Sequence, residues 1–285
     1  MKRALTREKV LATANRLPSF PRAIQGILAT LDDPAASARI LDQFVRSDPA
    51  VAARILYLAN SAAAHGGRRD RISNLPFAVS LIGHRKVREL VMMSSLQGFI
   101  HSLAERGAGQ WLWSHGLAVS ICCEEVSRHV AASPLGGAAL IAGLLHDVGQ
   151  LWLIRFEADA FAEVQRVARD EAVSIDLPEK EAFGHDHATI GAWLAENWLL
   201  PDPIVQGIQY HHQPDSALDE PLVPIVHIAE VLSHALDLSQ SESRVGYLSA
   251  QACAKLDLTW NADSQHLFGR IEGRSRHANA LLWAA

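Results

Sequence analysis

The sequence has few cysteines, few aromatic residues and no long apolar run, and each shortage excludes a class of protein. Three cysteines in 285 residues cannot build a disulfide framework, which favours a reducing compartment. The longest apolar stretches, such as residues 138–145, are far shorter than the roughly 20 residues that a membrane-spanning helix needs. The N-terminus is charged without an apolar segment after it, so we expect no signal peptide. These shortages predict a cytoplasmic protein without a membrane partner.

Excess charge is also missing. The formal net charge is −5, and hydrophobic residues make up 49% of the chain. A basic nucleic-acid-binding protein is therefore disfavoured. A generally disordered chain is disfavoured too, because disorder requires low hydrophobicity together with high net charge. We expect a folded protein that does not bind nucleic acid.

Strand signals are missing as well: apolar and polar residues do not alternate over a strand length, and no Asn-Gly or Asp-Gly dipeptide occurs. Apolar residues recur instead at spacings of three and four, which is typical of a helix with one buried face. Asp33-Pro34, Ser47-Asp48-Pro49 and Asp202-Pro203 resemble helix starts, with Asp or Ser at the N-cap and Pro at or near the first position. The sequence therefore predicts an all-α fold.

Two polar or glycine-rich segments predict the domain boundaries. Residues 106–109 read Arg-Gly-Ala-Gly, and residues 239–243 read Ser-Gln-Ser-Glu-Ser. Such segments are typical of loops and linkers. We expect an N-terminal helical subdomain over residues 1–108, a second helical subdomain over 109–238 and a helical C-terminal tail over 239–285.

Histidine is abundant, with 14 residues, about 5% and roughly twice ordinary usage. His146 and Asp147 end an apolar run, and Gly149 is expected to stop that helix. Burying these polar groups costs free energy unless they are paired or bind a metal. Imidazole and carboxylate together suit Fe, Mn or Zn. Further candidate ligands beside apolar helical segments are, in chain order, His115, His187, His211, His212 and Glu230.

An alternative without metal stays open. His146 and Asp147 would then hydrogen-bond inside a helical core, with His115 as a partner. Both interpretations predict that these residues face one another, and metal content separates them.

The order of the candidate ligands resembles the HD superfamily of metal-dependent phosphohydrolases. In that superfamily a His, a His-Asp pair and a later Asp bind one metal ion, and additional histidines complete a two-metal site in some branches. The resemblance implies that His115, His146, Asp147 and Glu230 bind a first ion. It implies that His187, His211 and His212 bind a second.

Two further runs of sequence, one of them in the N-terminal half, narrow the resemblance to one family within this superfamily. The run from Asp48-Pro49 to Ala59-Asn60-Ser61 and the run from Gly184 to Leu194 are similar to the HDOD domain, the HD-related output domain of bacterial signalling proteins. The resemblance spans about residues 14–235. It implies a bacterial regulatory module in which an N-terminal helical subdomain packs on an HD-like helical bundle.

Three positions depart from the hydrolases. Glu230 stands where they have Asp. Gln150 stands where the cyclic-dinucleotide hydrolases of the HD-GYP branch have a Lys, and Gln cannot supply its point charge to phosphate. The Gly-Tyr-Pro signature of that branch is missing after His211-His212. These departures favour a non-catalytic signalling module that binds a partner protein, or a nucleotide or cyclic-dinucleotide ligand. Its histidine cluster would be structural or would bind one or two divalent ions.

The alternative hypothesis is a metal-dependent phosphodiesterase that acts on a nucleotide or a cyclic dinucleotide. Asp147 would then bridge two metal ions that activate water and stabilise phosphoryl charge. Phosphodiesterase activity that depends on Asp147 separates the two hypotheses.

Overall fold

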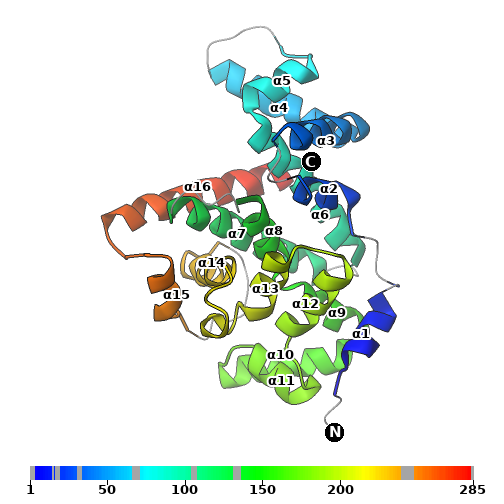
Figure 1. The fold of residues 1–285 in the computed structure, drawn as a ribbon, viewed down its shortest axis with the longest axis vertical. Helices are drawn as coiled ribbons and strands as arrows, with labels where there is room; N and C mark the ends of the chain where they lie inside the picture. Colours follow the sequence, from blue (N-terminus) through cyan, green and yellow to red (C-terminus); the bar gives the residue numbers. More distant parts are fainter. Residues whose placement is uncertain are drawn as a thin grey trace. The chain divides into compact units, whose positions relative to one another are not determined.

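The computed structural model describes residues 4–14, 16, 20–30, 34–65, 71–103, 108–130, 136–238 and 247–283. Within these ranges every regular element is helical (Figure 1), which confirms the predicted all-α fold. The helices form two compact units. One unit is Ser19–Ile100. The other, called the histidine unit below, joins Met1–Pro18 to His101–Ala285.

The Ser19–Ile100 unit is built from consecutive helices. The predicted helix starts at Pro34 and Pro49 are confirmed, and the Asp48 side chain accepts a hydrogen bond from the backbone N–H of Val51 at 3.2 Å. The Asn60 side chain donates to the carbonyl of Ile72 and accepts from its N–H, at 2.9 and 2.7 Å. The helices of this unit are α2 (Arg22–Leu28), α3 (Pro34–Ser47), α4 (Pro49–His65), α5 (Leu75–Ile82) and most of α6 (His84–Leu103).

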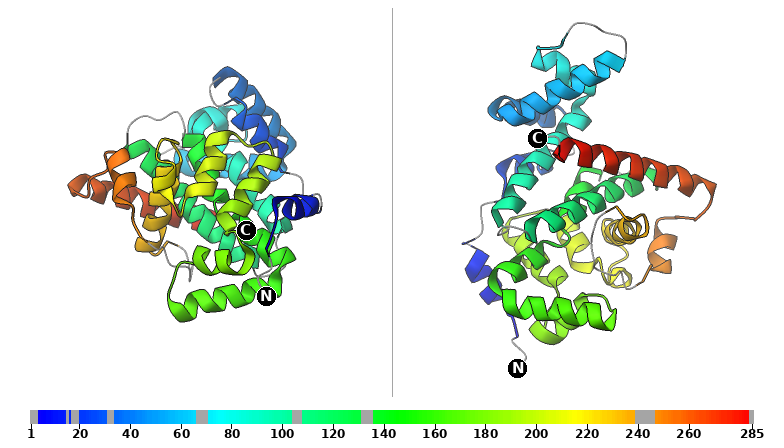
Figure 2. Two further views of the ribbon diagram at one scale, coloured as in Figure 1. Left: turned by 60° about the horizontal axis from the view of Figure 1, so that its bottom comes forward. Right: turned by 180° about the vertical axis from the view of Figure 1, so that it is seen from behind.

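The histidine unit has a central group of packed helices: α7 (Ala108–His129), α8 (Gly136–Leu145), α13 (Asp202–Tyr210) and α14 (Val223–Ala235). Helix α8 contacts the other three, and α14 also contacts α7 and α13. Helix α12 (His187–Asn197) packs against α13 and α9 (Val148–Phe156), while α10 (Ala158–Glu171) and α11 (Asp176–Phe183) pair beside them (Figure 2). The long α16 (Ala262–Trp283) packs on α7. The remaining helices of the unit are α1 (Arg7–Ala14), the 3-10 helix η1 (Pro214–Ser216) and α15 (Ala250–Lys255).

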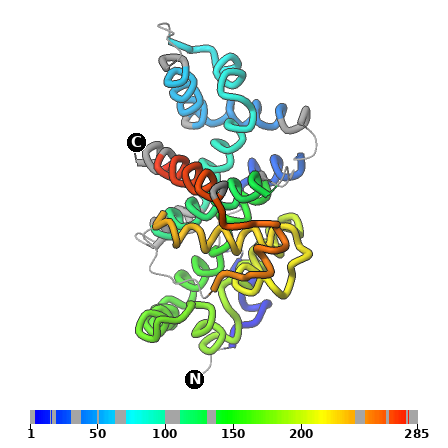
Figure 3. Tube along the Cα trace, turned by 90° about the vertical axis from the view of Figure 1, so that its left-hand side faces the viewer, coloured from blue at the N-terminus to red at the C-terminus, as the bar shows by residue number. Residues whose placement is uncertain are grey.

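The N-terminal segment packs against the histidine unit. The backbone N–H of Leu5 donates to the carbonyl of Phe183 at 2.8 Å, and the Trp152 indole N–H donates to the Thr13 hydroxyl at 2.9 Å. Helix α1, drawn in blue, contacts α12 (Figure 3). The structure therefore assigns Met1–Pro18 to the histidine unit. The subdomain boundaries expected from the sequence remain a prediction.

The most apolar stretch of the chain lies in the core. Residues Gly137–Phe156 are long and apolar enough to cross a membrane by length and composition, but 94% of the window is buried inside the protein. The stretch is divided at His146 and Asp147 into α8 and α9. Burial among neighbouring helices is typical of a core segment. Cys122, Cys123 and Cys253 are buried and free of disulfides.

Two expected helix boundaries are wrong. Gly149 lies inside α9 and does not end a helix. Glycine is required there because α9 and α12 approach closely, and a Cβ at position 149 would overlap the carbonyl oxygen of His187. At α13, Pro201 is the N-cap and Asp202 is already the first helical residue.

Candidate metal centre

The seven residues proposed from the sequence meet at one buried centre of the histidine unit. Their donor atoms fall into overlapping groups of three, in each of which all donors lie within 4.8 Å of one another. The backbone brings them together from five places: α7 carries His115, the turn between α8 and α9 carries His146 and Asp147, α12 opens with His187, the turn after α13 carries His211 and His212, and α14 carries Glu230.

The first group consists of His115, His146 and Asp147. The Nε2 atoms of His115 and His146 lie 3.7 and 3.5 Å from Oδ2 of Asp147. These contacts are longer than good hydrogen bonds, so the carboxylate faces both imidazoles without a close bond to either.

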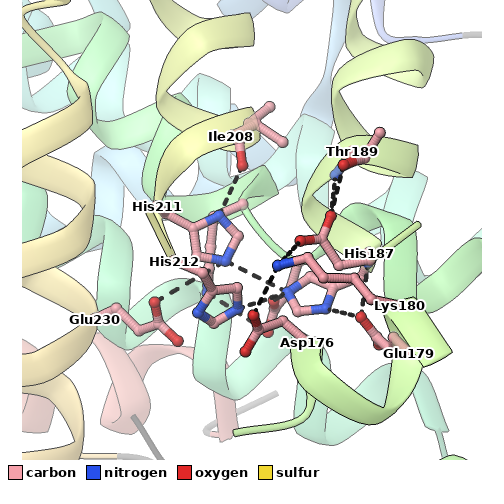
Figure 4. A network of polar contacts seen from close by, with 12 residues as sticks. Asp176, Glu179, Lys180, His187, Thr189, Ile208, His211, His212 and Glu230 are labelled. Carbon is pink, nitrogen blue, oxygen red and sulfur yellow. Dashed lines mark hydrogen bonds and ion pairs between the residues drawn. The ribbon is translucent and has the colours of Figure 1, made fainter. Parts of the chain in front are cut away.

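The second group consists of His187, His211 and His212 (Figure 4). Nε2 of His187 lies 3.0 Å from Nε2 of His212 and 3.4 Å from Nε2 of His211. The same atom lies 3.0 Å from Oδ1 of Asp147. The two oxygens of Asp147 therefore face different groups, as a bridging carboxylate requires.

The backbone and a buried carboxylate determine which imidazole nitrogen faces the centre. Nδ1 of His146 donates to the carbonyl of Gly143 at 2.8 Å, and Nδ1 of His211 donates to the carbonyl of Ile208 at 2.7 Å. Nδ1 of His187 donates to Oε2 of Glu179 at 2.6 Å. A neutral imidazole with a proton on Nδ1 presents the lone pair of Nε2, so the rings of His146 and His211, and that of His187 in its neutral form, offer a metal-binding nitrogen to the same space.

These atoms fit a cation. Nitrogen lone pairs and carboxylate oxygens at 3.0 to 3.5 Å repel one another unless a proton or metal ion lies between them. Two ligands at about 2.0–2.1 Å from a tetrahedral Zn ion are about 3.4 Å apart, which is close to these spacings. In addition, Nε2 of His146 and Oε2 of Glu230 are buried without a hydrogen-bond partner. The donor set of imidazoles and carboxylates suits Zn, Fe or Mn.

Burial keeps most of these imidazoles neutral. It lowers the pKa of His115 to about 3, with His146 contributing, and it lowers the pKa of His212 to about 3, with His187 contributing. Burial also lowers the pKa values of His146 and His211. Neutral imidazole is the form that binds metal, so burial prepares these side chains as ligands at neutral pH.

His187 and the carboxylates behave differently. Burial alone would lower the pKa of His187, but Glu179 and Asp147 flank its ring and raise the pKa well above the usual value. Burial alone would raise the pKa of Asp147, yet His146 and His187 lower it well below its usual value. Burial and the charge of Asp147 raise the pKa of Glu230. The space between His187 and Asp147 therefore favours positive charge.

Three supporting residues were missed in the sequence. Glu179 is fully buried, and its Oε2 accepts from both Nδ1 and the backbone N–H of His187. Nδ1 of His227 donates to the carbonyl of His211, and its Nε2 accepts from the backbone N–H of Ser249. His234 joins His115 and Glu230 in a further group of three. The spacing of His227, Glu230 and His234 indicates one helix face and could have identified these residues from the sequence. No sequence pattern indicates the role of Glu179.

The one positive side chain of the described residues that Figure 4 draws beside the centre, Lys180, is already paired. Lys180 makes an ion pair with Asp176 at 3.0 Å (Figure 4) and another with Asp186 at 2.9 Å. Gln150, at the position where a phosphate-binding Lys was considered, is 2% exposed, and its side-chain oxygen has no hydrogen-bond partner. The side chain of Gln150 therefore brings no charge to a phosphate.

The centre is almost closed to solvent. His146, His187 and His211 are 0% exposed, and Asp147 and Glu230 are only 6% and 5% exposed. Such a centre can hold metal ions, but it offers a large substrate little contact surface.

A family model of the HDOD domain matches residues 17–214. The chain belongs to the HDOD family. This confirms the resemblance seen in the sequence. An HDOD domain protein of unknown function from Geobacter sulfurreducens has a similar crystal structure, with a TM-score of 0.70 and 24% identity, covering 94% of this chain and 90% of that one.

Other relatives of this HDOD protein carry functional names of two kinds. A presumed phosphohydrolase from Shewanella amazonensis has a TM-score of 0.63 and 26% identity, covering 93% of this chain and 97% of that one. A presumed signal transduction protein from Marinobacter aquaeolei has a TM-score of 0.67 and 22% identity, covering 97% and 64%. An uncharacterised protein of Treponema pallidum is 22% identical over 223 residues, 78% of this chain. This chain spans only 43% of that curated relative.

Proposed function

We propose that this HDOD protein is a metal-binding regulatory module of bacterial signalling that acts without catalysis. One observation carries the proposal: donor atoms from five separate parts of the histidine unit converge in a centre that is nearly closed to solvent, and two of them, Nε2 of His146 and Oε2 of Glu230, are buried without a hydrogen-bond partner. His115, His146 and Asp147 would hold one ion and His187, His211 and His212 another, with Glu230 between them. Bound ions would then stabilise the conformation that a partner recognises.

Two features favour a regulatory role of this protein over a catalytic one. The position of the phosphate-binding Lys holds the neutral Gln150, and Lys180 is engaged by Asp176 and Asp186. The exposed fraction of the ligand side chains is too small to receive a cyclic dinucleotide without rearrangement. A signalling protein partner, or a nucleotide or cyclic dinucleotide bound outside the metal centre, fits this proposal, as does a cytoplasmic location.

The test is metal content, measured by elemental mass spectrometry on protein purified without chelator and without a histidine tag. We expect one or two equivalents of Zn, Fe or Mn in the wild type and their loss in Asp147→Ala. Asp159→Ala, an exposed aspartate on α10, is the matched control and should keep its metal. A wild-type protein that stays folded and metal-free, and that takes up none of the three ions on titration, would contradict the proposal.

A second function, phosphodiester hydrolysis, is favoured by one specific observation. The two oxygens of Asp147 face two different groups of histidines, the arrangement that a two-metal hydrolase uses. Bound ions would supply activated water and charge stabilisation. The measurement is hydrolysis of bis-p-nitrophenyl phosphate and of a cyclic dinucleotide with added Mn. Activity that disappears in Asp147→Ala and persists in Asp159→Ala would establish this second function and overturn the non-catalytic proposal.

A further inference from the structure

Between α7 and α14 lies a group of three potential metal ligands, and only two of them belong to the ligand set proposed above. Glu230 and His234 stand four residues apart on α14, so both side chains project from one face of the helix. His115 on α7 lies opposite, and one donor atom from each of the three lies within 4.8 Å of the others. The rings of His115 and His234 have centroids 5.1 Å apart.

The hydrogen bonding of this group is incomplete. Nε2 of His234 and Oε2 of Glu230 are both buried atoms without a hydrogen-bond partner. Glu230 as a residue is only 5% exposed. Buried polar atoms are normally paired, and exceptions call for an unplaced ligand. A metal cation satisfies an imidazole nitrogen and a carboxylate oxygen at the same time.

Glu230 stands where the resemblance to the HD hydrolases implies the shorter Asp. The longer side chain of Glu230 lies within reach of two groups: His146 with His211, and His115 with His234. A carboxylate can serve both because its two oxygens can bind different ions. An imidazole nitrogen binds one ion at a time. The ion that binds His115 would therefore be held by Glu230 and His234 of α14 as well as by His146 and Asp147.

We propose that His234 is a metal ligand and that, with His115 and Glu230, it forms a third ligand group on the α7–α14 face. The inference rests on the proposed function, because His115 and Glu230 are shared with the main centre. Its mixed nitrogen and oxygen donors suit Zn, Co, Fe or Mn. Two donors about 2.1 Å from one ion can be at most about 4.2 Å apart, so side-chain adjustments of several tenths of an ångström complete the group.

The test is titration of metal-free protein with Zn by calorimetry and with Co by visible absorption. His234→Ala and His234→Gln should weaken at least one binding step about tenfold or more and change the cobalt absorption band. His129→Ala, a part-buried histidine at the end of α7 outside the centre, should behave as the wild type. Thermal unfolding of the metal-free proteins measures packing separately from metal binding.

The outcomes distinguish the two proposals. If the wild type binds no ion, the proposed function fails and this inference fails with it. If the wild type binds ions, Asp147→Ala loses them and both His234 variants keep wild-type affinity and cobalt spectrum, only the inference about His234 is overturned. A lower unfolding temperature with an unchanged cobalt spectrum would assign His234 a packing role and would also overturn it.

Discussion

One buried carboxylate, that of Glu179, holds both the ring and the backbone of His187. Glu179 accepts hydrogen bonds from Nδ1 of that ring and from the backbone N–H of His187 at 2.6 and 2.7 Å. Fixing the ring nitrogen that faces away from a metal also fixes the orientation of the nitrogen that faces it. At the scale of the residue, Glu179 is therefore a positioning residue for the centre.

Replacing Glu179 tests this role. Glu179→Ala leaves two donors of His187 without an acceptor and frees the ring to rotate. We expect Zn affinity to fall about 10- to 100-fold, the usual cost of losing an outer-shell partner, as measured by calorimetric titration. Glu181→Ala, an exposed glutamate on the same helix, should leave the affinity unchanged. Equal affinities in the two folded variants would show that Glu179 does not position the ligand.

At the scale of the helix, α9 and α12 approach too closely for a side chain at position 149. Gly149→Ala would drive a Cβ against the carbonyl oxygen of His187 and the backbone of Gly191. Backbone cannot give way as a flexible side chain can, so we expect a loss of about 3 kcal/mol or more in the free energy of unfolding, together with weaker metal binding.

Gly269→Ala is the matched control, because a Cβ there meets nothing within 4 Å on the exposed face of α16. It should be neutral or stabilise by up to about 1 kcal/mol, since Ala favours a helix over Gly. Urea unfolding followed by circular dichroism measures both variants. Similar stabilities for the two would mean that α9 and α12 separate easily.

A charged cluster attaches α16 to α7. Glu125 accepts from Nε of Arg270 at 2.8 Å and from Nη1 of Arg274 at 2.6 Å. Burial alone would raise the pKa of Glu125, but the bonds from Arg270 and Arg274 outweigh it and lower the pKa below the ordinary 4.5. A lowered pKa in the folded state stabilises the fold above the unfolded pKa, and this stabilisation is lost as the pH falls through the folded value.

Glu125→Gln removes this contribution. At pH 7 we expect it to lower the free energy of unfolding by about 2 kcal/mol, less than the about 3 to 5 for a fully buried pair, because both arginines reach solvent. The difference from the wild type should shrink below about pH 4.5, where the unfolded carboxyl becomes protonated. Urea midpoints between pH 3 and 7 measure it, and a difference independent of pH would contradict the assigned role.

At the scale of the whole molecule, the histidine unit needs the first residues of the chain. Leu5 and Val10 are 2% and 0% exposed, and the segment also pairs Lys9 with Glu157 at 2.6 Å. Burying one such apolar side chain contributes about 1.5 to 3 kcal/mol. Deleting residues 1–18 should therefore lower the stability of the histidine unit by about 3 to 5 kcal/mol, seen as faster hydrogen exchange in α12.

Arg7→Ala provides the control for this deletion. The Arg7–Glu196 ion pair is well exposed on both sides, and such pairs are worth under about 1 kcal/mol. Exchange in α12 that is unchanged by the deletion would show that the histidine unit is stable without α1.

The sequence by itself determined the helical class, the family and the identity of the seven candidate ligands, because apolar spacing and residue order are properties of the chain. It predicted Gly149 as a helix stop, which is wrong, because the close approach of α12 depends on packing between helices far apart in the sequence.

Only the tertiary structure decided how the ligands are arranged. Which oxygen of Asp147 faces which histidine, the support of His187 by Glu179 and the place of His234 beside His115 all arise where separate helices meet. Local propensity carries no information about such contacts, because burial of apolar faces over the whole unit brings these side chains together.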